Sequence, residues 1–142
     1  MNLDFKKCLE RGALVKINFD YGLVEKEINE AEKDLKSAEK SLSDNDPKWA
    51  IIQAYYSMFH AAKGLVFLQG YREKSHYCLL TALEELYVLT NKIEPRLSRN
   101  FRECMISRMD ADYGLAYSDR SAEHIIKVAK EFLQKSKELT KR

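Results

Sequence analysis

The stretch WAIIQAYYSMFHAAKGLVF, residues 49–67, decides the fold of this chain. Its apolar side chains surround the helix axis on more than one side instead of forming a single stripe. A helix that is apolar on several faces must be covered on several faces. The stretch therefore predicts a central helix from Trp49 to about Gln69, ended by Gly70, since glycine is common directly after a helix. The apolar positions are Ile51, Ile52, Tyr55, Tyr56, Met58, Phe59, Leu65, Val66 and Phe67.

Upstream of the central helix, the spacing of apolar residues predicts a long amphipathic helix over roughly 21–42. Apolar residues recur there at steps of three and four, and charged residues fill the other faces. The segment SDNDP interrupts this pattern. It places Asp46 as an N-cap and Pro47 in the first turn of the central helix. The recurring apolar positions are Ile28, Ala31, Leu35, Ala38 and Leu42.

Downstream of the central helix, the sequence predicts three further helices. A short polar loop, Tyr71 to Lys74, leads to Ser75 as the N-cap of the first of them. The second covers about 96–113, and the third follows the N-cap Ser118 and dissolves into a polar tail, residues 136–142. The first of these helices turns Leu79, Leu83, Leu86 and Leu89 inward.

Short links between long helices make neighbouring helices antiparallel. We therefore predict an all-α fold, an up-and-down antiparallel helical bundle of four to five helices. The chain forms one domain over residues 1–142, with residues 1–20 as a short N-terminal extension.

The composition supports helices and limits the classes of function. The chain has 142 residues, of which 45% are hydrophobic and 32% are charged. Five Gly and two Pro make 7 of 142, about 5%, against roughly 12% in average proteins, which leaves little room for the turns of an all-β fold. The net charge is only +2, so no overall field attracts nucleic acid or acidic membranes. Any anion site must be local.

Hydropathy and cysteine usage indicate a cytoplasmic protein that is not inserted in a membrane. The longest charge-free run, residues 49–62, has 14 residues, fewer than the roughly 20 needed to span a bilayer. Charges also interrupt the N-terminal segment, where a secretory signal needs an apolar run. Cys8, Cys78 and Cys104 are odd in number, far apart and without zinc-ligand spacing, so we predict three reduced thiols.

The three histidines differ in their surroundings. His60 lies on the central helix, where a hydrogen-bonded structural imidazole is the commoner role. His76 lies at the mouth of a helix, and His124 is expected to face solvent. None of the three has a second His or Cys at the i+3 or i+4 position, so we predict neither a metal site nor a cofactor.

The residues Arg72, Lys74, Ser75 and His76 form a candidate nucleotide or anion site. They place cations beside the N–H groups of a helix N-terminus, and that combination attracts phosphate. The alternative is a solvated connecting loop in which Glu73 cancels one positive charge.

A second candidate site lies where the predicted fourth helix ends, in the segment MDADYG. Arg108 and Asp112 stand four residues apart, so they can pair along one helix face, and Tyr113 follows directly. Polar groups that converge at a helix end are typical of sites in helical bundles. The alternative is an exposed ion pair, worth a few tenths of a kcal/mol.

Three stretches together resemble the HEPN family, in particular a prokaryotic and archaeal branch related to the HEPN partners of minimal nucleotidyltransferases. They are the central helix quoted above, GYREKSHYCLLTALEELY and SRMDADYGLAYSDRSAEHIIKVAKEFL. The resemblance implies a helical bundle that often forms a homodimer and is often paired with a minimal nucleotidyltransferase. Many members look like metal-independent ribonucleases, and several act as toxins with the nucleotidyltransferase as antitoxin.

The ribonucleases of that family carry an Arg followed, after four to six residues, by a His. The matching Arg here is Arg108, and the following positions hold Tyr113, Gly114 and Leu115, so the expected His is absent. Two other pairs, Arg72 with His76 and Arg120 with His124, are one residue too short and lie elsewhere in the chain. In a subset of the family the partner transfers AMP to a Tyr five residues after the Arg, which makes Tyr113 a candidate for this modification.

Three functions remain open at this point. The first, which we favour, is a binding subunit of a nucleotidyltransferase–HEPN module that holds a nucleotide or RNA phosphate through Arg72, Lys74, Ser75, His76, Arg108 and Tyr113. The second is an endoribonuclease in which Arg108 works with Asp112, with Tyr113, or with a His brought in by folding or by a second subunit. The third is a structural dimerisation module. We favour binding because an Arg for phosphate is present and the family's proton-transfer His is missing.

Overall fold

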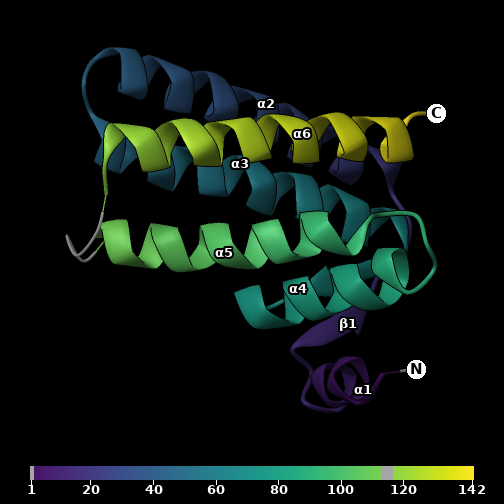
Figure 1. Ribbon diagram of the computed structural model, residues 1–142. Coiled ribbons are helices and arrows are strands. Elements are labelled where there is room, and N and C mark those ends of the chain that lie inside the picture. Colours follow the sequence, from purple (N-terminus) through teal and green to yellow (C-terminus); the bar gives the residue numbers. More distant parts are fainter. Residues whose placement is uncertain (1, 113–116) are drawn as a thin grey trace.

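The computed structural model describes residues 2–112 and 117–142, with side chains described for residues 2–108 and 117–142. Within these ranges the chain forms six α-helices, one π-helical segment and one pair of short strands, which confirms the all-α prediction (Figure 1). The elements are α1 (Leu3–Glu10), β1 (Leu14–Lys16), α2 (Tyr21–Ser43), α3 (Pro47–Leu68), β2 (Tyr71–Glu73), α4 (His76–Leu83), η1 (Glu84–Val88), α5 (Pro95–Asp112) and α6 (Asp119–Thr140).

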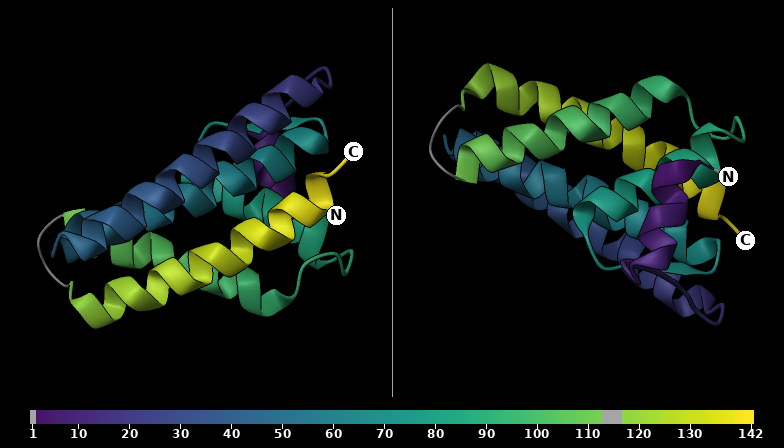
Figure 2. Two further views of the ribbon diagram at one scale, coloured as in Figure 1. Left: turned by 90° about the horizontal axis from the view of Figure 1, so that it is seen from above. Right: turned by 90° about the horizontal axis from the view of Figure 1, so that it is seen from below.

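Helix α3 is the centre of the bundle, as its apolar faces predict. It packs against α2, α5 and α6 and also contacts α4 and β2. Thirteen of its residues are buried, so neighbouring helices cover it on several sides. Gly64 permits a close approach to α2, because a Cβ there would lie 3.3 Å from the Ile28 side chain. Figure 2 shows the long helices side by side, with both chain ends at the same end of the bundle.

The predicted helix caps are present. The Asp46 side chain accepts a hydrogen bond from the Trp49 amide at 3.2 Å, and Pro47 occupies the first turn of α3. Ser75 caps α4 by accepting from the Cys78 amide at 3.0 Å. Ser118 begins α6 with a capping box shared with Ser121. These caps satisfy amide groups that the first helical turn leaves without partners.

The segment after α3 differs from the prediction. Residues 71–73, expected as part of a polar loop, form strand β2, which pairs antiparallel with β1 in the register Leu14 to Glu73. The prediction was wrong because strand pairing is a long-range contact, and the partner lies in the N-terminal extension, where no strand was expected. The helix that follows is also interrupted, since α4 gives way at Glu84 to the π-helical segment η1.

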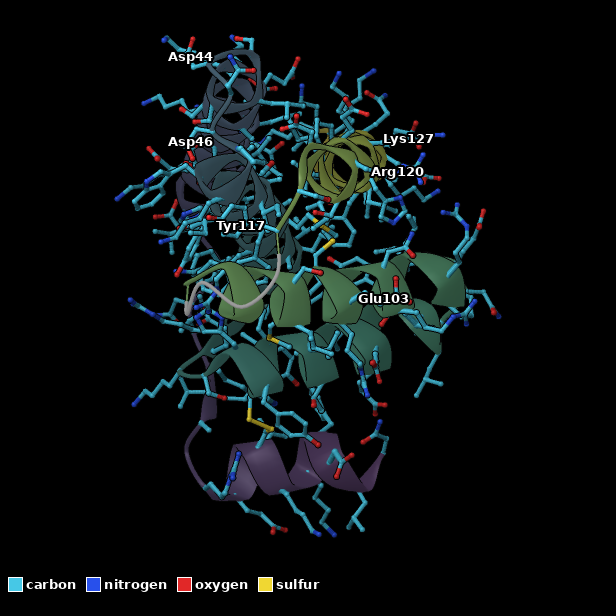
Figure 3. All side chains as sticks on the ribbon, turned by 60° about the vertical axis from the view of Figure 1, so that its left-hand side comes forward. Asp44, Asp46, Glu103, Tyr117, Arg120 and Lys127 are labelled. Atoms are coloured by element: carbon cyan, nitrogen blue, oxygen red, sulfur yellow. A yellow bond between two sulfur atoms is a disulfide. The ribbon has the colours of Figure 1, made fainter. Side chains whose placement is uncertain are left out.

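The cysteine prediction was also wrong for two of the three residues. Cys8 of α1 and Cys78 of α4 form a disulfide, which Figure 3 shows as the bond between sulfur atoms joining these two helices. Cys104 is a free thiol, and its burial raises its pKa to about 12. Sequence distance concealed the pair, because 70 residues separate the two cysteines and the contact of α1 with α4 is a tertiary contact.

The length and hydrophobicity of the helices bear on the prediction that the protein is not inserted in a membrane. Among the described residues, no helix combines the length and hydrophobicity that a bilayer-spanning segment requires.

Candidate functional site

Arg108 lies in the last turns of α5, on the helix face that carries the buried residues Phe101 and Cys104 toward the core. It is half-buried, and its guanidinium carbon lies 5.1 Å from the ring centroid of Tyr55 and 5.6 Å from that of Tyr56. Both tyrosines belong to α3. A guanidinium at this distance from aromatic rings is attracted by their negative faces, so the two tyrosines position Arg108 at the edge of the core.

His76 reaches the same tyrosine from α4. Its Nδ1 lies 2.6 Å from the Tyr55 hydroxyl oxygen, and the Arg108 guanidinium lies over the ring of the same tyrosine. The His76 ring stacks on Phe59, with ring centroids 4.4 Å apart and planes inclined by 19°. We call Tyr55, Tyr56, Phe59, His76 and Arg108 the Arg108 cluster. It joins three helices, α3, α4 and α5, around one buried phenol.

The electrostatics of the Arg108 cluster favour a neutral imidazole and a protonated phenol. Burial lowers the pKa of His76, and the positive charges of Arg108 and Lys63 lower it further. Burial also raises the pKa of Tyr55, although the Arg108 charge opposes that shift. At neutral pH the cluster therefore presents one fixed cation and one uncharged imidazole, both half-buried.

The structure separates the residues of the first candidate site. His76 turns into the Arg108 cluster, and Ser75 uses its hydroxyl to cap α4. Arg72 and Lys74 are exposed. Side chains alternate along a strand, so Arg72 points to the face of β2 opposite Tyr71 and Glu73. The Lys74 amide donates to the Ala13 carbonyl at 2.8 Å.

Replacing both Arg72 and Lys74 with alanine is therefore expected to have only a small effect on anion affinity. We expect a loss of less than about threefold, because exposed charges act through solvent and are screened by salt. Titration of RNA or ATP against this double variant and the wild type, at low and at physiological salt, measures the effect. A loss above about tenfold that persists in salt would restore these residues to the binding site.

The second candidate site is described only in part. Asp112 is the last residue of α5, but its side chain lies outside the described residues, and so does Tyr113. The Arg108–Asp112 pair and the role of Tyr113 therefore stay predictions.

The structure corrects one expectation about Arg108. The sequence analysis found no imidazole at the family spacing and inferred that Arg108 lacks one. The fold supplies His76, through Tyr55, from a different helix. Tyr55 itself was assigned only to the core. The signal that could have found it is the polar hydroxyl of a tyrosine on the most buried helix, because a buried tyrosine usually hydrogen-bonds.

His60 lies beside the Arg108 cluster, where its ring contacts Phe59, and it is hydrogen-bonded, as expected for a structural imidazole. Its Nδ1 lies 2.6 Å from Glu27 Oε2, and its Nε2 lies 3.6 Å from Asp34. Lys63 lies within 4 Å of both Glu27 and Glu73, so the network links α2, α3 and β2. Within the residues whose side chains are described, no group of three or more His, Cys, Asp or Glu could hold a metal ion.

The His60 network predicts a pH-dependent stability. The hydrogen bond to Glu27 raises the pKa of His60, and burial opposes the shift. A raised folded-state pKa stabilises the fold below the ordinary His pKa, and that stabilisation is lost as the pH rises through the folded-state pKa.

We therefore expect His60→Gln to lose more stability at about pH 5.5 than at about pH 9. Urea unfolding of wild type and variant at both pH values measures the difference. The comparison cancels the contribution of Glu73, whose pKa burial raises. Asp34 belongs to the measured effect, because burial raises its pKa and the His60 charge opposes that shift. An equal loss at both pH values would contradict the assignment.

Comparison with known proteins places this architecture in a family. The model of the HEPN domain matches residues 24–139, which include α2 to α6 almost completely. The chain belongs to the HEPN family. The N-terminal unit of α1 and β1 precedes the matched HEPN region.

Relatives of this HEPN protein come from archaea. It is 28% identical over 116 residues to "Putative toxin MJ0142" of Methanocaldococcus jannaschii, covering 80% of this chain and 79% of the relative. It is 33% identical over 121 residues to a UPF0332 protein of Archaeoglobus fulgidus, covering 80% of this chain and 92% of the relative. A third similarity, to the UPF0332 protein PH1297 of Pyrococcus horikoshii, covers 37% of each chain at 45% identity.

Proposed function

We propose that this HEPN protein binds a phosphate group of RNA or of a nucleotide between Arg108 and His76. The observation that carries the proposal is the convergence of both side chains on Tyr55, His76 on its hydroxyl and Arg108 on its ring. A guanidinium forms strong, charge-assisted hydrogen bonds to phosphate. Both groups are half-buried, so their interactions with a ligand are less screened than those of surface charges. Tyr56 and Phe59 add apolar ring surface beside the cation.

The partner in this proposal is a minimal nucleotidyltransferase, in a toxin–antitoxin pair located in the cytoplasm. Family membership supports it, together with the toxin name of the relative from Methanocaldococcus jannaschii. The HEPN chain would act as a homodimer, and Tyr113 would be the residue that receives AMP. Mass spectrometry after incubation with ATP and a minimal nucleotidyltransferase tests the modification. An adduct that persists in Tyr113→Phe would exclude Tyr113.

A second candidate function is metal-independent cleavage of RNA, which the imidazole near Arg108 favours. In this reaction the RNA 2′-oxygen attacks phosphorus, the bond from phosphorus to the 5′-oxygen breaks, and a 2′,3′-cyclic phosphate forms. Asp112, four residues after Arg108, would accept the 2′-hydroxyl proton, and a protonated His76 would donate a proton to the 5′-oxygen. Arg108 would stabilise the charge on phosphorus oxygens. The lowered pKa of His76 leaves this acid scarce at neutral pH.

One assay distinguishes these functions. Fluorescently labelled single-stranded RNA is incubated with the protein and EDTA at about pH 5.5 and about pH 7.5, and both anisotropy and strand length are followed. We expect saturable binding at both pH values and an intact strand at about pH 7.5. Cyclic phosphate ends that are lost in Arg108→Ala would favour the second function. A stable dimer that binds neither RNA nor ATP would overturn both and leave dimerisation as the function.

A further inference from the structure

We infer that Tyr55 is a positioning residue that holds His76 in the tautomer with its proton on Nε2, so that His76 offers phosphate a neutral hydrogen-bond donor beside Arg108. The tautomer follows from the geometry of the described side chains alone. The part that concerns phosphate rests on the function proposed above.

The direction of the hydrogen bonds at Tyr55 decides the tautomer. A phenol oxygen carries one hydrogen and two lone pairs, whereas a guanidinium carries only donors. The Tyr55 hydrogen therefore needs an acceptor, which the neighbouring Arg108 guanidinium cannot supply. His76 Nδ1, at 2.6 Å, is placed to accept it. Because Tyr55 is fully buried, water does not replace this acceptor.

Charges around the imidazole keep its Nδ1 lone pair available. Burial lowers the pKa of His76, and the positive charges of Arg108 from α5 and Lys63 from α3 lower it further. Two carboxylates face the Lys63 ammonium group, since Glu27 and Glu73 lie 3.8 and 3.9 Å from it. A neutral imidazole that accepts at Nδ1 must carry its proton on Nε2.

Aromatic stacking fixes where that proton can point. The His76 ring stacks on two rings of α3. Its centroid lies 4.4 Å from that of Phe59 and 5.9 Å from that of Tyr55, and the ring planes are inclined by 19° and 12°. With the ring plane held and Nδ1 engaged, the Nε2–H bond points away from the buried phenol. The imidazole is half-buried, so this donor lies at the accessible side of the cluster.

The tautomer determines what His76 can do for a phosphate ligand. Phosphate oxygens are acceptors, so Nε2–H complements them without adding a second charge. The same tautomer has no free lone pair, so His76 is not a general base at neutral pH. The Arg108 cluster thus offers an anion one guanidinium and one uncharged hydrogen-bond donor. Tyr55 acts on the ligand only through Arg108 and His76.

Nitrogen-15 NMR of labelled histidine tests the tautomer independently of any activity. The chain has three histidines, so His76→Gln assigns the signal. In the wild type at about pH 7.5, we expect His76 to show a protonated Nε2 and an unprotonated Nδ1. A protonated Nδ1 at that pH would overturn the inference.

Tyr55→Phe tests the positioning role, because it removes the hydroxyl and keeps the ring against Arg108 and Phe59. We expect the His76 pKa to rise, since its neutral form loses a hydrogen bond, and the affinity for inorganic phosphate or AMP to fall roughly three- to tenfold. Tyr87→Phe is the matched control, because Tyr87 is also buried and donates to the Leu65 carbonyl away from the cluster. Equal effects of both variants on the His76 pKa would overturn the positioning role.

The two proposals can fail separately. If the wild type has the expected tautomer but binds neither RNA nor nucleotide, the proposed function falls and the role of Tyr55 stands. If phosphate binds through Arg108 while His76 carries its proton on Nδ1, the function stands and the role of Tyr55 falls.

Discussion

Replacing Arg108 with alanine is expected to weaken the binding of single-stranded RNA or ATP by roughly ten- to a hundredfold. Hydrogen bonds to a charged group contribute about 1.5–3 kcal/mol, and about 1.4 kcal/mol corresponds to a tenfold change in affinity. Arg108 is half-buried against Tyr55 and Tyr56, so its charge is less screened than that of a surface arginine. Fluorescence anisotropy with labelled RNA, or calorimetry with ATP, measures the loss.

Two further variants make the Arg108 result specific. Arg102 lies on the same helix, is exposed and pairs with Glu84 at 3.2 Å, so Arg102→Ala removes the same charge from α5 without touching the cluster. We expect less than about a threefold loss for this control. Arg108→Lys keeps the charge but loses the planar fork that binds phosphate with two bonds, so its affinity is expected to lie between those of wild type and Arg108→Ala. Equal losses for Arg108→Ala and Arg102→Ala would show that binding depends only on net charge.

Reducing the Cys8–Cys78 disulfide is expected to lower stability strongly. The bond joins cysteines 70 residues apart, and a cross-link over a loop of this length contributes about 4 kcal/mol by the chain-entropy model. For a chain of this size that corresponds to a decrease in Tm of roughly 10 °C. Thermal unfolding followed by circular dichroism, with and without dithiothreitol, measures the change.

The disulfide prediction has an internal control. The double variant Cys8→Ala/Cys78→Ala cannot form the bond, so its Tm should be insensitive to dithiothreitol. Thiol titration of the denatured, unreduced wild type should detect one thiol, that of Cys104, which is the free cysteine. Three reactive thiols would show that Cys8 and Cys78 are reduced, as the sequence analysis first predicted.

Reduction also tests how the N-terminal unit supports the site. Cys78 lies two residues after His76, and its amide is the donor that Ser75 caps. The disulfide and the pairing of β1 with β2 both hold α1 and β1 against this start of α4. Loss of the bond therefore affects a segment that begins at the Arg108 cluster.

Much of the fold could be predicted because the sequence signals of a helix lie close together in the chain. The stretch expected over roughly 21–42 is α2, Tyr21–Ser43, and the stretch expected from Trp49 to about Gln69 is α3, Pro47–Leu68. Apolar spacing identified both helices, and Asp46 with Pro47 marked the start of α3. Each of these signals depends on residues within a turn or two of one another.

Less of the candidate site could be predicted. Arg108 was identified through its place near a helix end, and His76 through its place at a helix start, but the two were assigned to separate candidate sites. The spacing of the family motif concerns only the residues that follow Arg108 in the chain. The imidazole comes instead from α4 and meets Arg108 at a tyrosine of α3.

Periodicity, capping residues and the scarcity of glycine and proline were sufficient to specify a helical bundle around residues 49–67. They were not sufficient to bring Tyr55, His76 and Arg108 together, to pair Cys8 with Cys78, or to turn residues 71–73 into a strand. These contacts join segments that are far apart in the chain, and the packing of α3, α4 and α5 and the docking of α1 and β1 on α4 and β2 set their distance and orientation. Local sequence carries the spacing of residues along one helix, whereas the chemistry of this site depends on the distance between helices.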